Sequence, residues 1–200
     1  MKTIKLEKVF KSYKKNIILN QASYEFKPGN IHMIIGVNGV GKTTLIKAIL
    51  GLISFDGTIE VPFSKIEYVP EKFIFPDFVT VSKFIQSLLA IKKNNINDEY
   101  FNTTLKEWGL GECINKKVSK LSKGMRQKVL LLQALICDSE VYILDEPING
   151  LDKVSQLLFI NKLNKMRNEK RIIIITSHYP EIYKDIVDVN VYLEEGKLHD

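Results

Sequence analysis

The chain has 200 residues, 45% of them hydrophobic and 26% charged, and a formal net charge of +6. This composition predicts one globular domain with a sizeable core and excludes a disordered or fibrous chain. The positive balance is compatible with an anionic ligand, a negatively charged membrane surface or nucleic acid, although a lysine-rich solvated surface is the simpler interpretation.

Cys113 and Cys137 have neither metal-ligand spacing nor a disulfide framework around them, which predicts reduced thiols in a cytosolic compartment. The first seven residues mix charged and apolar side chains, so we expect no secretory signal peptide. No run approaches the ~18 apolar residues of a membrane span. If the protein works at a membrane, we expect another polypeptide to hold it there.

Strands are predicted first along the chain. The broadly alternating pattern over residues 3–26 and the turn at 28–30 predict β-strands that lead into a buried, β-branched strand over 31–35. Further strands are predicted near 57–61 and 66–69.

A phosphate-binding loop follows the 31–35 strand. The sequence GVNGVGKTT from Gly36 to Thr44 matches G-x-x-x-x-G-K-[ST] and precedes a helix predicted over 44–50. Its glycines let successive N–H groups point at an anion, and the helix N-terminus adds partial positive charge. We expect Lys42 to bridge the β- and γ-phosphates, Thr43 to bind Mg²⁺ and Thr44 to touch the α-phosphate. The predicted nucleotide-binding residues of this loop are Gly36, Asn38, Gly39, Val40, Gly41, Lys42, Thr43 and Thr44.

Helical spacing begins after Pro76. Apolar residues at helical intervals over 81–89 follow Thr80, a predicted N-cap, and helical patterns recur over 100–108 and after Ser122. Residues 76–135 are therefore predicted to form a mostly helical insertion.

Two continuous apolar runs, over 141–144 and 172–175, are typical of buried strands in a parallel sheet. A helix predicted from about 153 to 168 separates them, which is βαβ organisation. We expect a last strand over 189–193.

Asp145 and Glu146 follow the 141–144 strand, at the edge where open α/β sheets bind ligands. Asp145 is suited to hold Mg²⁺ through water, and Glu146 is suited to orient and polarise an attacking water. Alone, such a pair more often begins a polar loop. Beside a phosphate-binding loop it predicts the metal-binding and water-activating half of an NTPase site.

The order of these motifs resembles that of the ATP-binding cassette (ABC) transporter ATPases along nearly the whole chain. The sequence LSKGMRQK from Leu121 to Lys128 stands where the family has its LSGGQ signature. Residues 148–152 look like the family's D-loop, and residues 176–178 look like its switch-histidine segment. Tyr13 matches the aromatic residue that stacks on adenine.

The resemblance implies an α/β P-loop NTPase fold with a RecA-like core, an N-terminal antiparallel β-subdomain and an inserted helical subdomain. The single ABC domain spans 1–200. Its nucleotide-binding core and β-subdomain cover about 1–75 and 136–200, and the helical subdomain with the signature covers about 76–135.

The resemblance also implies ATP and Mg²⁺ as ligands and two cassettes that pair head to tail, so that each ATP lies between one subunit's phosphate loop and the other's signature. His178 is then the γ-phosphate sensor, and Ser122, Lys123 and Gly124 contact the partner's nucleotide. A serine cap that opens a helix offers a hydroxyl and free N–H groups to a phosphate, although spacing alone favours an ordinary helix start.

Two positions depart from the family pattern. Lys123 and Met125 replace a glycine and the glutamine of LSGGQ, a change that we expect function to survive. Glu71 replaces the glutamine of the family's Q-loop. A carboxylate there can approach Mg²⁺ but repels the triphosphate when no metal is bound, so we count Glu71 among the metal-site residues.

The leading prediction is the ATP-hydrolysing motor subunit of a transporter, with Glu146 and His178 as its catalytic residues. It would be cytoplasmic, held at the inner face of the membrane by transmembrane permease subunits, and paired with an identical or related ABC subunit. The LSKGM signature resembles those of bacterial exporters.

One alternative is a soluble ABC ATPase acting on nucleic acid or ribosomes, but the segment from Thr44 to Leu121 is too short for a long coiled-coil arm. We therefore do not expect nucleic acid as a partner. Another alternative is a nucleotide-binding regulatory module that does not hydrolyse ATP, which intact Lys42, Asp145, Glu146 and His178 disfavour.

Overall fold

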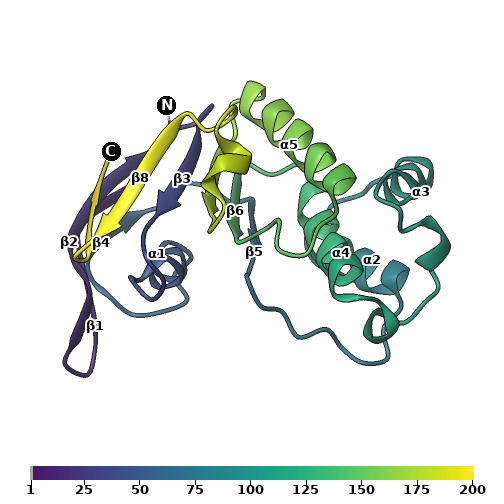
Figure 1. Cartoon of the computed structure of the whole chain (residues 1–200), viewed down its shortest axis with the longest axis horizontal. Coiled ribbons are helices and arrows are strands. Elements are labelled where there is room, and N and C mark those ends of the chain that lie inside the picture. The colour runs from purple at the N-terminus through teal and green to yellow at the C-terminus, as the bar shows by residue number, and fades with distance from the viewer. Residues whose placement is uncertain (1) are drawn as a thin grey trace.

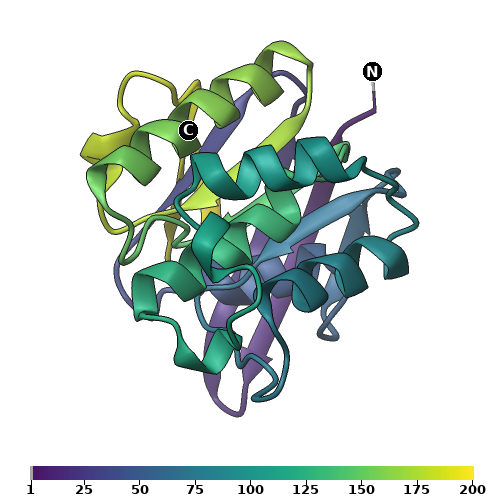
Figure 2. The same ribbon diagram turned by 90° about the vertical axis from the view of Figure 1, so that its right-hand side faces the viewer.

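The computed structural model describes residues 2–200 and contains two β-sheets with helices packed against them (Figure 1). The smaller sheet and the helix that follows the phosphate loop lie at one end of the molecule. Three helices from the middle of the chain gather at the other end, and Figure 2 shows them in front of the sheets.

The smaller sheet is antiparallel, with the strand order β2-β1-β4. Its long hairpin pairs Ile4 with Phe26 at one end and Tyr13 with Asn16 at the other, so the chain reverses over Lys14 and Lys15. The predicted strands are confirmed here as β1 (Ile4–Tyr13), β2 (Asn16–Phe26) and β4 (Asp56–Glu60).

The larger sheet has the order β5-β6-β7-β3-β8-β9, and its first five strands are parallel. β6 and β7 are buried along their whole length, as their continuous apolar runs predict. The parallel strands are β3 (Ile31–Ile35), β5 (Ile66–Val69), β6 (Val141–Asp145), β7 (Ile172–Thr176) and β8 (Val189–Glu194).

β8 is not the last strand, so that prediction is wrong. β9 (Lys197–His199) pairs antiparallel with β8 across the turn at Glu195 and Gly196. Both turn residues have positive φ, 49° and 77°, which is the geometry of a tight two-residue hairpin. Glu-Gly is a weaker hairpin signal than Asn-Gly or Asp-Gly, and β9 is short.

The hydrophobic core lies on both faces of the larger sheet, because neighbouring strand residues point to opposite sides. On β7, Ile173 and Ile175 pack with the helices of the middle and later chain, whereas Ile172 and Ile174 pack toward Leu45 and the smaller sheet. The larger sheet is therefore covered by packed side chains on both faces.

The helices begin at side-chain caps wherever the sequence offers one. The Thr80 and Ser122 hydroxyls accept hydrogen bonds from the N–H groups of Lys83 and Met125, which confirms the predicted Thr80 cap. The α-helices are α1 (Lys42–Ile49), α2 (Val81–Ile91), α3 (Asp98–Glu107), α4 (Lys123–Leu135) and α5 (Lys153–Asn168). We propose that α2, α3 and α4 form the predicted helical subdomain.

Candidate nucleotide site

The loop between β3 and α1 lies so close to β2 and β8 that two of its glycines cannot be replaced by a residue with a side chain. Gly41 precedes α1 with φ 120°, and a Cβ there would lie 2.5 Å from Ile18 Cγ2. A Cβ on Gly36 would lie 2.8 Å from the Leu193 carbonyl oxygen. Any side chain at these positions would collide with β2 or β8 and displace the loop. This loop conformation therefore requires glycine at both positions.

Lys42 lies inside this loop and is only 8% exposed. Its Nζ donates to the carbonyl oxygens of Gly36, at 2.7 Å, and Val37, at 3.3 Å. These contacts hold a positive charge at the centre of a loop whose backbone is shaped for an anion.

Asp145, at the end of β6, is 2% exposed and accepts hydrogen bonds from two threonines. Thr43 Oγ1 lies 2.9 Å from Asp145 Oδ2, and Thr176 Oγ1 lies 2.5 Å from Oδ1. The parallel register sets Asp145 directly beside Thr176, and this fixes the carboxylate against the first turn of α1.

Glu146 is buried and has a positive φ of 51°, a backbone conformation that costs energy in a residue other than glycine. Its N–H donates to Thr176 Oγ1 at 3.1 Å, and its Oε2 accepts from the His178 N–H at 3.2 Å. His178 Nε2 lies 3.3 Å from Oε1 without forming a hydrogen bond, so Oε1 has no hydrogen-bond partner within residues 2–200. Burial raises the pKa of the Glu146 carboxyl, and the His178 N–H and ring oppose that rise.

A cavity of about 340 Å³ joins these groups. Glu71 lies on its wall, in the segment after β5, so three carboxylates face the space that also holds Lys42. The lining residues are Asn38, Gly39, Gly41, Lys42, Thr43, Thr44, Glu71, Asp145, Glu146 and His178.

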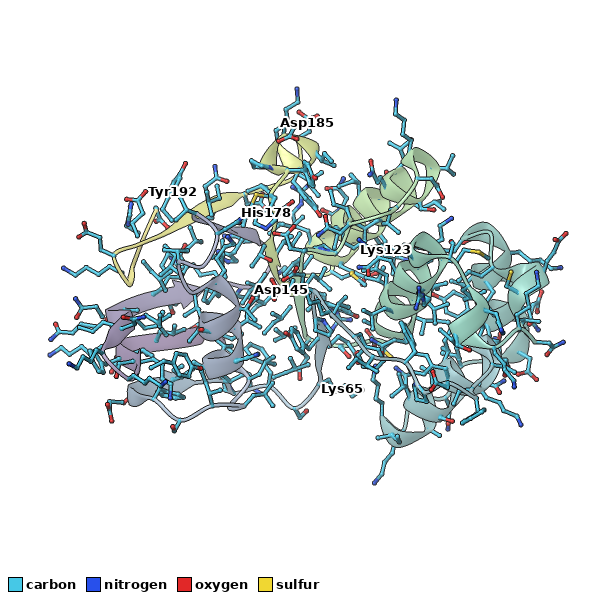
Figure 3. The ribbon with its side chains drawn as sticks, turned by 60° about the horizontal axis from the view of Figure 1, so that its bottom comes forward. Lys65, Lys123, Asp145, His178, Asp185 and Tyr192 are labelled. Atoms are coloured by element: carbon cyan, nitrogen blue, oxygen red, sulfur yellow. The ribbon has the colours of Figure 1, made fainter. Side chains whose placement is uncertain are left out.

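The start of α4 lies apart from this cavity, against the segment that follows Glu146. A Cβ on Gly124 would lie 2.5 Å from the Gly150 carbonyl oxygen, so only glycine permits this approach. Gln127 Nε2 donates to the Pro147 carbonyl oxygen at 2.9 Å, and Lys128 Nζ lies 2.7 Å from Asp152 Oδ2. In Figure 3, Asp145 and His178 lie near the middle of the molecule, and Lys123 lies over the helical part.

Residues 19–149 match the profile of the ABC transporter family. The chain belongs to this family. It is 36% identical over 180 residues to the zinc import ATP-binding protein ZnuC of Rickettsia conorii, a match that covers 88% of this chain and 76% of that protein. It is 29% identical over 208 residues to the manganese transport system ATP-binding protein MntB of Halalkalibacterium halodurans, a match that covers 96% of this chain and 80% of that protein.

A solved structure of the ATP-binding subunit of an ABC transporter has a TM-score of 0.90 to this chain at 22% identity, covering 100% of this chain and 89% of that one. The likeness confirms the predicted fold class. Family membership makes this ABC ATPase the ATP-binding and ATP-hydrolysing subunit of a transporter, and it does not favour action on nucleic acid or ribosomes. Within residues 2–200, no helix is both long and apolar enough to cross a membrane.

Six residues predicted to bind nucleotide do not line the cavity of this ABC ATPase. Gly36 and Val40 belong to the loop but are not among the lining residues. Tyr13, at the end of β1, is 47% exposed and has Lys11 Nζ 5.1 Å from its ring centroid. The other three are the signature residues Ser122, Lys123 and Gly124.

Thr176 is the site residue to which sequence reasoning assigned no role. Its hydroxyl contacts both Asp145 and Glu146. Thr176 ends β7, the strand that lies beside β6, so it stands next to Asp145. Its role could be predicted only if the order of the strands in the sheet were known.

Proposed function

We propose that this ABC ATPase binds Mg²⁺-ATP in the 340 Å³ cavity, with the loop from Gly36 to Thr44 around the phosphates. The hydroxyl of Thr43 and the carboxylate of Asp145 are hard oxygen donors, 2.9 Å apart, and they fit Mg²⁺, with Glu71 as a further oxygen on the same wall. When bound, the metal neutralises charge on the β- and γ-phosphates.

The observation that carries the proposal is the convergence of Lys42, Asp145, Glu146 and His178 on one cavity. Glu146 takes a proton from the water that attacks the γ-phosphorus, while the bond from that phosphorus to the ADP oxygen breaks and Lys42 stabilises the charge. Burial suits Glu146 to this role because it raises the pKa of the carboxyl and so makes the carboxylate a better proton acceptor. The His178 ring is 44% exposed and free to turn toward the γ-phosphate.

Glu146→Gln tests this assignment. The amide keeps the size of the side chain and loses its basicity, so we expect unchanged ATP affinity and a loss of turnover of about 100-fold or more. ATP binding by equilibrium titration and phosphate release measure the two effects. Hydrolysis at the wild-type rate would remove Glu146 from the mechanism.

We further propose that two cassettes pair head to tail and share their nucleotides. The separation of Ser122, Lys123 and Gly124 from the cavity of their own chain supports this arrangement, because these residues then face the cavity of a second subunit. Ser122 caps α4, which leaves N–H groups and a positive helix end for a γ-phosphate.

The permease subunits would bind beside Glu71, where Ile74 and Phe78 are 94% and 83% exposed, and would hold this chain at the inner face of the membrane. The names of ZnuC and MntB support a divalent metal ion as cargo. The name of ZnuC, a zinc import protein, favours import over the export suggested by the LSKGM signature. Co-purification of a membrane protein, followed by ATPase assays of that complex with zinc or manganese, tests both points.

A further inference from the structure

Tyr183 is a wholly buried side chain with an unexplained hydroxyl. It lies at the end of the 3-10 turn η3 (Pro180–Tyr183), five residues after His178, with its ring in edge contact with Phe159 of α5 at 6.5 Å between centroids. Ser177 is a polar neighbour of its hydroxyl, but no hydrogen bond of proper geometry reaches that oxygen from any described residue.

Such a hydroxyl lowers stability, since it has left water without gaining a new partner. Phenylalanine would fill the same space without that cost. The packing therefore does not explain why the chain has tyrosine here, and a buried unsatisfied polar group in a folded protein calls for another explanation.

The complementary atom is Glu146 Oε1, also buried and also without a hydrogen-bond partner in the described chain. One atom is an acceptor and the other a donor. Both belong to the segments that follow β6 and β7, which are joined by the hydrogen bond from the His178 N–H to Glu146 Oε2. Burial raises the pKa of the Tyr183 hydroxyl, and the negative charge of Glu146 raises it further.

We propose that Tyr183 is a positioning residue for Glu146, whose Oε1 accepts a hydrogen bond from the Tyr183 hydroxyl, directly or through one buried water. The bond forms when the His178 ring turns from Glu146 toward the γ-phosphate, and it keeps the carboxylate aimed at the attacking water. A carboxylate oxygen has two lone-pair sites, so this bond leaves Glu146 able to accept the proton. The inference rests on the proposed role of Glu146.

Tyr183→Phe tests the proposal, because it removes only the hydroxyl. We expect kcat to fall by about tenfold while the KM for ATP changes by less than about twofold, since positioning acts on the chemical step. The melting temperature without nucleotide should stay the same or rise, because the variant loses an unsatisfied polar group.

Tyr142→Phe is the matched control, since Tyr142 is equally buried but its hydroxyl donates to the Cys137 carbonyl oxygen at 2.6 Å and accepts from the Ser139 N–H at 3.0 Å. This control should lower the melting temperature and leave kcat unchanged. If Tyr183→Phe instead follows the pattern of Tyr142→Phe, or if kcat falls together with the melting temperature, Tyr183 is structural and the proposal is overturned.

The double variant Glu146→Gln/Tyr183→Phe separates this inference from the proposed function. It should turn over ATP no more slowly than Glu146→Gln alone, because the side chain that Tyr183 positions no longer acts as a base. If Glu146→Gln keeps the wild-type rate, the proposed function has failed. If Glu146→Gln is inactive and Tyr183→Phe is fully active, only the role of Tyr183 has failed.

Discussion

Glu71 puts a third carboxylate on the wall of the cavity in which we propose that ATP binds. It faces the same space as Asp145 and Glu146, and the charges of Asp145 and Glu71, after burial, raise the pKa of the nearby Tyr68 to about 12. In the proposed site, these three negative charges would repel a nucleotide that carries no metal. A bound divalent ion reverses the effect, because each carboxylate then faces a cation.

We therefore expect Glu71→Gln to bind metal-free ATP more tightly, by about tenfold, with little change when Mg²⁺ is present. Titration of nucleotide with and without Mg²⁺ measures the difference. Glu99→Gln, which removes an exposed charge in the first turn of α3, should change neither affinity. Equal Mg²⁺ dependence in wild type and Glu71→Gln would contradict the expectation.

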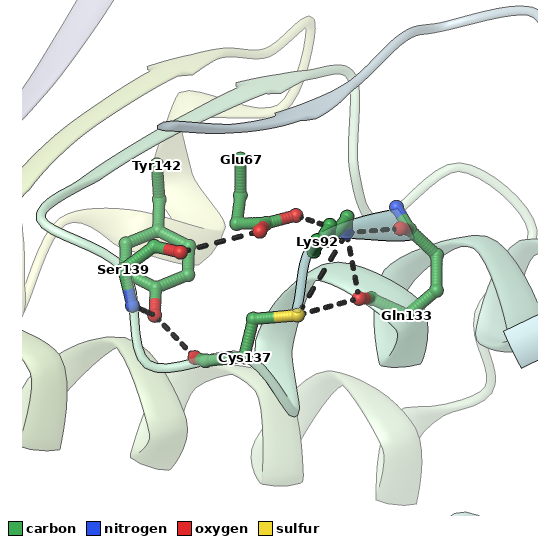
Figure 4. A network of polar contacts seen from close by, with 6 residues as sticks. All are labelled: Glu67, Lys92, Gln133, Cys137, Ser139 and Tyr142. Atoms are coloured by element: carbon green, nitrogen blue, oxygen red, sulfur yellow. Dashed lines mark hydrogen bonds and ion pairs between the residues drawn. The ribbon is translucent and has the colours of Figure 1, made fainter. Parts of the chain in front are cut away.

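At the scale of elements, a buried polar network joins the helical part to the edge of the larger sheet (Figure 4). Lys92 Nζ, at the end of α2, lies 2.5 Å from Glu67 Oε2 on β5 and 2.7 Å from Gln133 Oε1 on α4. The other Glu67 oxygen accepts from Ser139 Oγ at 3.2 Å. A fully satisfied network of this kind fixes α2 and α4 relative to β5, the strand that leads to Glu71.

Lys92→Met should lower the free energy of unfolding by about 3 kcal/mol, because it leaves the Glu67 carboxylate buried without its cation. The double variant Lys92→Met/Glu67→Gln should recover part of that loss. Urea denaturation measures both, and Lys93→Met, at the exposed neighbouring position, should stay within about 0.5 kcal/mol of wild type. Equal stability of Lys92→Met and Lys93→Met would show that the network adds nothing.

For the whole molecule, the cavity of the phosphate loop and the start of α4 are the two halves of the nucleotide site that we propose, and they do not meet within one chain. The phosphate-loop cavity and the signature at the start of α4 are separate, although Gln127 and Lys128 fasten the signature to the segment after Glu146. A nucleotide that binds across two subunits shifts them toward the paired state.

We expect saturating ATP to convert the Glu146→Gln variant from monomer to dimer in light-scattering measurements. Adding Lys123→Glu should reduce the dimer fraction at the same ATP concentration, because it puts negative charge near the partner's γ-phosphate. ATP affinity of the monomer should not change, since Lys123 lies outside its own cavity. Lys120→Glu controls for the loss of a nearby positive charge. A monomer at saturating ATP would refute head-to-tail pairing.

The sequence by itself determined the local features of this protein. The glycine loop, the Thr80 cap and the buried runs over 141–144 and 172–175 are confirmed at nearly the predicted residues, because caps, turns and apolar periodicity depend on neighbours in the chain. The family resemblance rests on the order of such local motifs and is confirmed for the same reason.

Only the tertiary structure decided which distant atoms meet. The contact of Thr176 with Asp145 follows from the parallel register of β6 and β7. The ion pair of Lys92 with Glu67 follows from packing α2 on α4 and α4 on β5. The separation of Ser122 from the phosphate loop, and the lack of a hydrogen-bond partner for the Tyr183 hydroxyl among the described residues, also depend on how distant elements pack. Such contacts join residues far apart in the chain, and they depend on how the whole core packs rather than on any local pattern.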